Sequence, residues 1–207
     1  MDTGCLRKWF AIDILAIGIS LLACGPPRLS ASSSVALAPD RKALLVTSAN
    51  PTAAARLTLQ SLPTESTTAP GLFFRPERFE LVHTSPDGRY AAFSTAGHHS
   101  LVGLLPLETM AVREIDMVTE GEVVAFHWAA DSRLLVYEYL PASGYRRVKA
   151  YDVQSSEHLV VPRLDGKSST HITFDGWGQN ERELIVTMTD IRSTGRETAA
   201  VTLVPHK

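Results

Sequence analysis

A short motif recurs four times along this chain, and its period constrains the fold more than any other feature of the sequence. In each copy an Asp or Asn is followed within two residues by a basic residue, and then by an apolar run typical of β-strands. The four polar residues are Asp40, Asp87, Asp131 and Asn180, at spacings of roughly 44 to 49 residues. A repeat of this length indicates a propeller or a solenoid, because each copy can bury its apolar face only against its neighbours.

The second copy shows what the motif does to the backbone. In Ser85-Pro86-Asp87-Gly88, proline presets φ at the second position of a type I turn and glycine suits the fourth. Segments rich in Val, Tyr, Phe and Leu flank the turns, as expected of antiparallel strands. The strands expected from this pattern are 79–84, 123–128, 133–139, 147–153, 157–162, 182–189 and 197–204. The third copy contains four of them, which is the composition of a propeller blade.

Two of the copies carry a more specific resemblance. Ser85-Pro86-Asp87-Gly88-Arg89 with Ala91-Ala92-Phe93, and Trp128-Ala129-Ala130-Asp131-Ser132-Arg133, resemble the TolB-like or WD40-like (PD40) β-propeller repeat. The resemblance covers roughly residues 33 to 207 and implies a fold, not an activity. That fold is all-β, a small β-propeller of about four four-stranded antiparallel blades, with repeats at about 35–78, 79–122, 123–170 and 171–207.

The last repeat is expected to be incomplete. Strands can be assigned to it only as far as its third, at 197–204, before the sequence ends at Lys207. We therefore expect a ring that stays partly open, with an unpaired strand edge that invites another chain.

The first 23 residues have the pattern of a targeting segment, expected as a signal helix. Arg7 and Lys8 precede an apolar run that ends in Leu21-Leu22-Ala23-Cys24-Gly25. This ending resembles the lipobox of bacterial lipoprotein signal peptides, which implies removal of residues 1–23 and lipidation of Cys24. The alternative is an uncleaved transmembrane helix. A membrane span needs about 20 apolar residues, whereas this run is shorter and contains Asp13, which is costly at membrane depth.

Lipidation of Cys24 would fix where the protein works. Residues 24–34 are rich in Pro and Ser, which favours an extended, flexible tether between the lipid and the domain at 35–207. The expected location is the cell envelope, anchored to the membrane on its extracytoplasmic side, or the periplasmic face in a Gram-negative cell.

Composition and motifs narrow the chemistry. Cys5 and Cys24 are the only cysteines, so the processed domain would have no thiol for a disulfide, a metal or nucleophilic attack. A net charge of −2 gives no electrostatic footprint for nucleic acid. The sequence has no Gly-x-Ser-x-Gly elbow, no His-Glu-x-x-His helix and no phosphate-binding glycine-rich loop. We therefore expect no catalytic residue, no metal and no cofactor.

Regularly spaced histidines raise one metal hypothesis. His83, His127 and His171 are roughly 44 residues apart, and three imidazoles could converge on zinc in a central channel. If the fourth repeat is aligned by matching Trp177 with Trp128, however, His171 falls about five residues out of register. We therefore favour hydrogen-bonded histidines on inner strands over a zinc site.

Other polar and aromatic groups have two interpretations each. His98-His99 are expected in an exposed hairpin loop rather than as a ligand pair, and Arg146-Arg147 at an exposed strand start rather than as an anion site. Tyr137, Tyr139 and Tyr145 predict either an aromatic surface for a partner or packing between blades. At least one of Phe126 and Trp128, just before a turn, should pack between neighbouring sheets.

Together these features predict an extracytoplasmic lipoprotein that acts as a non-catalytic protein-interaction or scaffold module. A partner protein or a second copy is expected at the open last blade. The alternative is a small-ligand-binding or enzymatic propeller, with a site at the blade-loop end of the central axis. A deep pocket lined by polar side chains from three or more blades favours the alternative. A flat face with an apolar or aromatic patch favours a protein partner.

Overall fold

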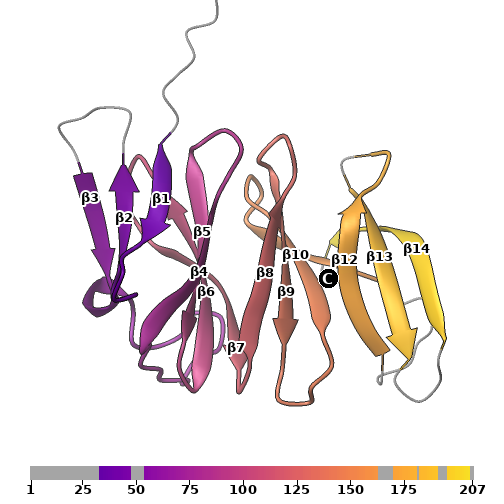
Figure 1. Cartoon of the computed structure of the whole chain (residues 1–207), viewed down its shortest axis with the longest axis horizontal. Helices are drawn as coiled ribbons and strands as arrows, with labels where there is room; N and C mark the ends of the chain where they lie inside the picture. The colour runs from indigo at the N-terminus through magenta and orange to yellow at the C-terminus, as the bar shows by residue number, and fades with distance from the viewer. Residues whose placement is uncertain (1–32, 48–53, 163–169, 181, 191–194, 206–207) are drawn as a thin grey trace, which may run out of the picture.

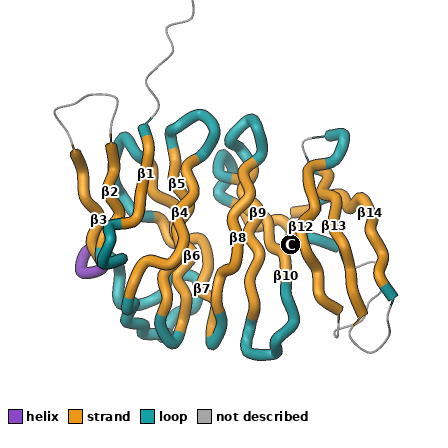
Figure 2. Tube along the Cα trace, in the orientation of Figure 1, coloured by secondary structure: helices purple, strands orange, loops and turns teal. Residues whose placement is uncertain are grey.

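The computed structural model describes residues 33–47, 54–162, 170–180, 182–190 and 195–205. Nearly all regular structure in these ranges is β-strand (Figure 2). The first sheet contains β1 (Ser34–Leu37), β2 (Ala43–Thr47) and β3 (Ala54–Thr58), followed by a 3-10 turn, η1 (Leu59–Ser61). The second contains β4 (Arg78–Thr84), β5 (Tyr90–Ala96), β6 (His99–Pro106) and β7 (Arg113–Thr119). The third contains β8 (Glu122–Trp128), β9 (Leu134–Leu140), β10 (Arg147–Asp152), β11 (Glu157–Val160) and β15 (Val204–Pro205), and the fourth contains β12 (Thr170–Trp177), β13 (Glu183–Asp190) and β14 (Arg196–Thr202).

The sheets are antiparallel and follow one another along the chain, which confirms the all-β, blade-like architecture. Their first strands begin one residue before the boundaries predicted at 35, 79, 123 and 171. Four strands per blade holds only for the second sheet, since the first and fourth have three and the third has five. The expected strand at 197–204 is broken at Leu203, whose side chain turns into the core. Val204 then leaves β14 and pairs with Val160 at the outer edge of the third sheet.

The recurrent Asp or Asn has the same structural role in all four sheets. Its Oδ1 accepts a hydrogen bond of 2.9 to 3.0 Å from the backbone N–H two residues later. The four pairs are Asp40 with Lys42, Asp87 with Arg89, Asp131 with Arg133, and Asn180 with Arg182. Such side-chain capping of a turn is the reason that Asp and Asn are favoured there. The four turns are therefore structurally equivalent, including the turn of the divergent fourth repeat.

The apolar core lies in three layers, one between each pair of neighbouring sheets. Phe79 and Phe93 belong to the layer between the first two sheets, where their rings meet edge to face with centroids 5.5 Å apart. Phe126 and Trp128 belong to the layer between the second and third sheets, as predicted, and both are buried. Leu184 and the buried apolar residues around it fill the third layer. Each sheet is therefore held by its neighbours, as in repeat proteins.

The four sheets stand in an open row (Figure 1). The first and fourth sheets lie at opposite ends of this row, and β1 pairs with β2 rather than with β14, so the described sheets do not close into a ring. The outward face of the fourth sheet carries Thr173, Thr187 and Thr198 in register across its three strands. Thr187 donates a hydrogen bond to Asp175 and lies 2.7 Å from the hydroxyl of Thr198. This polar network covers a face that, in a closed propeller, would be apolar and packed against another blade.

The first sheet is reversed relative to the second, because its β1–β2 turn lies at the opposite end of the strands from the β4–β5 turn. Its turn lies at the start of β4, where Phe79 N–H donates to Arg41 O at 2.8 Å and the Arg41 guanidinium pairs with Glu80 at 2.8 Å. The turns of the second and third sheets instead lie side by side, because Asp87 N–H donates to the Ser132 hydroxyl at 2.9 Å.

None of the described segments forms a helix long and apolar enough to cross a membrane. Cys5, Cys24, the expected signal helix at 1–23 and most of the tether at 24–34 lie outside the described residues.

A carboxylate on β7 holds the long connection from the first sheet to the second. The side chain of Glu114 accepts five hydrogen bonds of 2.5 to 3.3 Å from the hydroxyls of Ser66, Thr67 and Thr68 and from the backbone N–H groups of the two threonines. Burial alone would raise the pKa of Glu114, but these hydrogen bonds outweigh it and lower the pKa below its usual value.

Glu114→Ala is expected to lower the free energy of unfolding by about 2 kcal/mol, because five donors lose a charged acceptor at a half-buried site. Urea unfolding at pH 7 measures this. Since the folded-state pKa is depressed, the contribution of Glu114 is complete above its unfolded-state pKa and disappears as the pH falls below about 4. Exposed Glu108→Ala is the control and should change stability by less than about 0.5 kcal/mol. An equal effect of the two substitutions would contradict this role.

Candidate functional site

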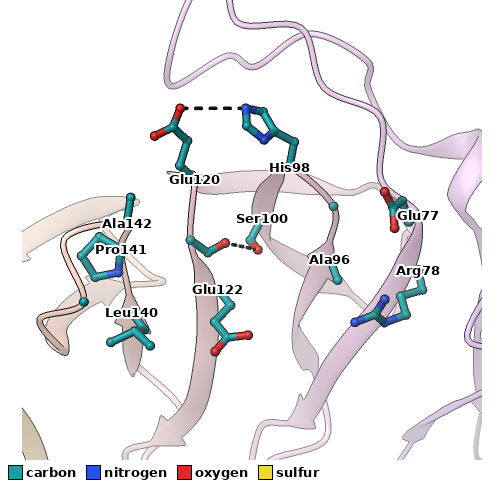
Figure 3. Close-up of a pocket in the computed structure, with 13 residues that line it drawn as sticks. Glu77, Arg78, Ala96, His98, Ser100, Glu120, Glu122, Leu140, Pro141 and Ala142 are labelled. Carbon is teal, nitrogen blue, oxygen red and sulfur yellow. Dashed lines mark hydrogen bonds and ion pairs between the residues drawn. The ribbon is translucent and has the colours of Figure 1, made fainter.

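A hollow of about 890 Å³ opens between the second and third sheets, at the end of their strands where their hairpin loops meet (Figure 3). The start of β4 and the hairpin from β5 to β6 form one side. The short link from β7 to β8 and the hairpin from β9 to β10 form the other. Connections between sheets and within sheets therefore converge here, as expected of the blade-loop end of a propeller.

The floor of the hollow is fixed by close backbone packing. The Ser100 hydroxyl, on the buried start of β6, donates to Gly121 O at 2.8 Å. A Cβ at Gly121 would lie 2.5 Å from Leu140 O, so only glycine allows the link to lie against the third-sheet hairpin.

The walls of the hollow are predominantly acidic. Glu77, Glu120 and Glu122 supply carboxylates, and His98 Nε2 lies 3.9 Å from Glu120. Arg78 also lines the hollow, but its guanidinium pairs with Glu80 at 2.7 Å. The arrangement suits cationic or hydrogen-bond-donating groups. In the ranges that the structure describes, no three His, Cys, Asp or Glu side chains group as metal ligands.

The regularly spaced histidines each have a separate hydrogen-bond partner. His83 Nδ1–H donates to Phe126 O at 3.0 Å, and His127 Nε2 lies 2.9 Å from a Glu138 carboxylate oxygen. His171 Nδ1 accepts the backbone N–H of Arg146 at 3.0 Å. His83 and His127 are both the next-to-last residue of their inner strand, whereas His171 is the second residue of β12. The structure therefore places His171 out of register, as the alignment on the turns predicts.

The paired basic residues differ in exposure. His98 is exposed and His99 half-buried, with ring centroids 4.4 Å apart, which agrees with a hairpin loop. The predicted exposed strand start at Arg146-Arg147 is wrong in detail, because both residues are half-buried. Arg146 lies 3.6 Å from the buried Glu138 carboxylate, and Arg147 donates to Thr170 O across to the fourth sheet.

The three tyrosines do not form one aromatic surface. Tyr137 is fully buried between the second and third sheets and donates to Asp116 at 2.7 Å. Burial, followed by the charge of Asp116, raises the pKa of Tyr137 well above its usual value. Tyr139, on the same face, is half-buried beneath the Lys149 ammonium, whereas Tyr145 contacts the His171 ring. Packing between blades is therefore the better description for Tyr137.

The outer edge of β14 is the second candidate site. Among the described strands, only β13 pairs with β14. Leu203 N–H donates to Arg182 O on the β13 side, so the odd-numbered residues direct their backbone groups toward β13. The even-numbered residues, which are Arg196, Thr198, Ala200 and Thr202, direct theirs away from the sheet.

Comparisons with known proteins find likeness only at the level of three-dimensional structure. No protein-family model and no curated protein matches the chain. Among solved structures, one from a study of two prolyl endopeptidases is 16% identical with a TM-score of 0.46, covering 83% of this chain and 28% of that one. The β-propeller domain of the Trilobed protease from Pyrococcus furiosus is 14% identical with a TM-score of 0.45, covering 75% and 48%. TolB from Acinetobacter baumannii is 12% identical with a TM-score of 0.44, covering 80% and 40%.

The chain spans less than half the length of each of these three proteins. They include peptidases as well as TolB, so their names do not select between an enzyme and a binding protein. The blade-like architecture rests on this chain's own strand order and its fourfold turn.

Proposed function

We propose that this protein is a membrane-anchored, extracytoplasmic lipoprotein that acts as a non-catalytic protein-interaction module. The observation that carries the proposal is the outer edge of β14, which offers four N–H and four C=O groups to a partner strand. A strand added there would satisfy these groups by β-augmentation.

The composition of β14 also supports docking. Edge strands are normally blunted by charge, proline or a bulge. In β14 the charged residues Arg196 and Glu197 occupy only its first two positions, and the next five residues are uncharged. Four of those five side chains are Thr or Ala, so an approaching backbone meets little steric hindrance.

A lipid on Cys24 would determine which partners this edge meets. Ser33, the first described residue, lies nine positions after Cys24. At about 3.3 Å per residue, the tether would keep the domain within roughly 30 Å of the lipid surface. The partner that we propose is therefore another protein at, or in, the same membrane.

Site-specific photocrosslinking in cells expressing the full chain tests the proposed function. A benzophenone amino acid at position 200 should give a discrete protein adduct, because the backbone N–H and C=O of this residue point away from β13, toward the site of the proposed partner strand. The matched control is position 56 on β3, at the outer edge of the first sheet, which should give no such adduct. Ala200→Pro, combined with crosslinking from position 198, should abolish the adduct by removing one outward N–H without breaking the β13 ladder.

The mass of the adduct identifies the occupant. An adduct of twice the mass of the chain would assign the edge to a second copy. Equal labelling from positions 56 and 200, or no adduct from position 200, would argue against the proposed function.

Cys24→Ser should abolish lipidation, because the acyl group is carried by the Cys24 sulfur. Metabolic labelling with a clickable fatty acid should mark the wild-type chain and the Cys5→Ser variant equally, and leave Cys24→Ser unlabelled. Persistent label in the Cys24→Ser protein would rule out the lipoprotein part of the proposal.

A further inference from the structure

A second hollow, of about 880 Å³, opens between the first and second sheets beside the one already described. Glu77 and His98 line both hollows. The two therefore form one trough across the ends of the first three sheets, with Phe73 in one half and Glu122 in the other. The reversed packing of the first sheet brings its turn residue Lys42 to this end of the molecule.

The two halves of the trough differ in chemistry. The half between the first and second sheets contains Phe73, which is 69% exposed, together with the cations of Lys42 and Arg75, and it shares the Glu77 carboxylate with the other half. The half between the second and third sheets contains the carboxylates of Glu120 and Glu122. The trough is therefore basic and aromatic at one end and acidic at the other.

Phe73 is held in solvent by its surroundings. The neighbouring Phe74 is buried in the core between the first two sheets, which directs the adjacent side chain outward. Glu65 pairs with Phe73 in an isolated β-bridge, and Phe74 N–H donates to Thr64 O at 2.9 Å. The Glu114 carboxylate fixes the same connection at Thr67 and Thr68. A fixed backbone reduces the entropy lost when Phe73 binds a partner. Phenylalanine is also among the residues enriched at the buried centres of protein interfaces.

We propose that this trough binds an extended peptide segment of a partner protein. An apolar side chain of the segment packs on Phe73, its acidic groups lie near Lys42 and Arg75, and its Lys or Arg residues lie over Glu120 and Glu122. Charge complementarity sets both the direction and the composition of the segment. The trough is distinct from the β14 edge, so this surface goes beyond the proposed function and does not depend on it.

Selection from a random dodecapeptide display library against the full-length protein in detergent tests this inference. We expect enriched peptides that carry apolar residues toward one end and Lys or Arg toward the other. Synthetic copies should bind Phe73→Ala at least tenfold more weakly than wild type. The double variant Glu120→Lys with Glu122→Lys should also lose at least tenfold in affinity, and should prefer peptides with acidic residues at that end.

Two control variants distinguish the trough from non-specific binding to exposed apolar or acidic side chains. Leu45→Ala removes another exposed apolar side chain, on the outward face of the first sheet, and should leave affinity unchanged, as should Glu108→Lys. Thermal unfolding of each variant confirms that it is folded. Peptides that lose binding with Ala200→Pro but not with the trough variants would overturn this inference and support the β14 edge. Failure to enrich any peptide sensitive to Phe73→Ala would also overturn it.

Discussion

Replacing Trp128 with alanine is expected to lower the free energy of unfolding by about 3 to 5 kcal/mol. The indole is buried in the layer between the second and third sheets, so truncation leaves a cavity there. Its Nε1–H also donates to His83 O at 3.0 Å, while His83 Nδ1–H donates back to Phe126 O. This pair of bonds joins the second and third sheets, and the bond to His83 O is lost when the indole is removed.

Guanidinium unfolding of wild type, Trp128→Ala and Trp128→Phe separates packing from hydrogen bonding. Phenylalanine keeps most of the buried area and loses the bond to His83 O, so that variant should lose about 1 kcal/mol beyond the smaller packing change. The exposed Phe73→Ala provides the matched aromatic control and should stay within about 0.5 kcal/mol of wild type. A loss below about 1 kcal/mol for Trp128→Ala would mean that the second and third sheets are not held together through this side chain.

The repeat could be read from the sequence because its determinants are local. An Asp or Asn that caps a turn acts within two residues, so Asp87 and Asn180 identify equivalent turns despite different flanking residues. Strand alternation is equally local. It correctly places Tyr137 and Tyr139 on one face, and it implies that the intervening Glu138 lies on the opposite face, toward the fourth sheet. On that face its carboxylate meets His127 of the neighbouring strand β8.

The relative placement of the sheets could not be read in this way, because it depends on contacts between distant residues. The reversed first sheet brings Arg41 against Glu80, and the fifth strand of the third sheet pairs Val204 with Val160. Neither contact has a signature in a single sequence. The trough exists only because the first three sheets are placed side by side in this way. Nothing in the sequence therefore marks Phe73 as part of a binding surface. Gly121 is the one local signal, since a glycine in so short a link indicates close backbone approach.

No sequence motif indicates the role of Asp152, although its carboxylate is completely buried. One oxygen accepts the backbone N–H groups of Gln154 and Ser155 at 3.0 and 3.1 Å, and thereby fixes the turn from β10 to β11. The other accepts from the guanidinium of Arg133 at 2.9 and 3.0 Å. Arg133 is the basic residue of the third turn motif, so Asp152 ties that turn to the third strand of its sheet.

Asp152→Ala is therefore expected to cost about 3 kcal/mol, the lower end of the range for breaking a buried ion pair, because the Arg133 side chain is 35% exposed. Asp152→Asn should cost less, since its amide oxygen can still accept from the turn. Burial would raise the pKa of Asp152, but the hydrogen bonds from Arg133 and the two backbone N–H groups outweigh it and lower the pKa below its usual value of 3.8.

The sign of the pH dependence follows from this shift. A depressed folded-state pKa adds stability that is complete above the unfolded-state pKa and disappears as the pH falls through the folded-state value. Wild type should therefore lose more stability than Asp152→Asn between about pH 5 and pH 2, a window set by ordinary carboxyl pKa values near 4. Urea unfolding at several pH values, with exposed Glu108→Gln as the control, measures the difference. If Asp152→Asn lost stability with acid as steeply as wild type, the buried carboxylate could not be the group that is protonated, and its charge would not be what holds the third turn in place.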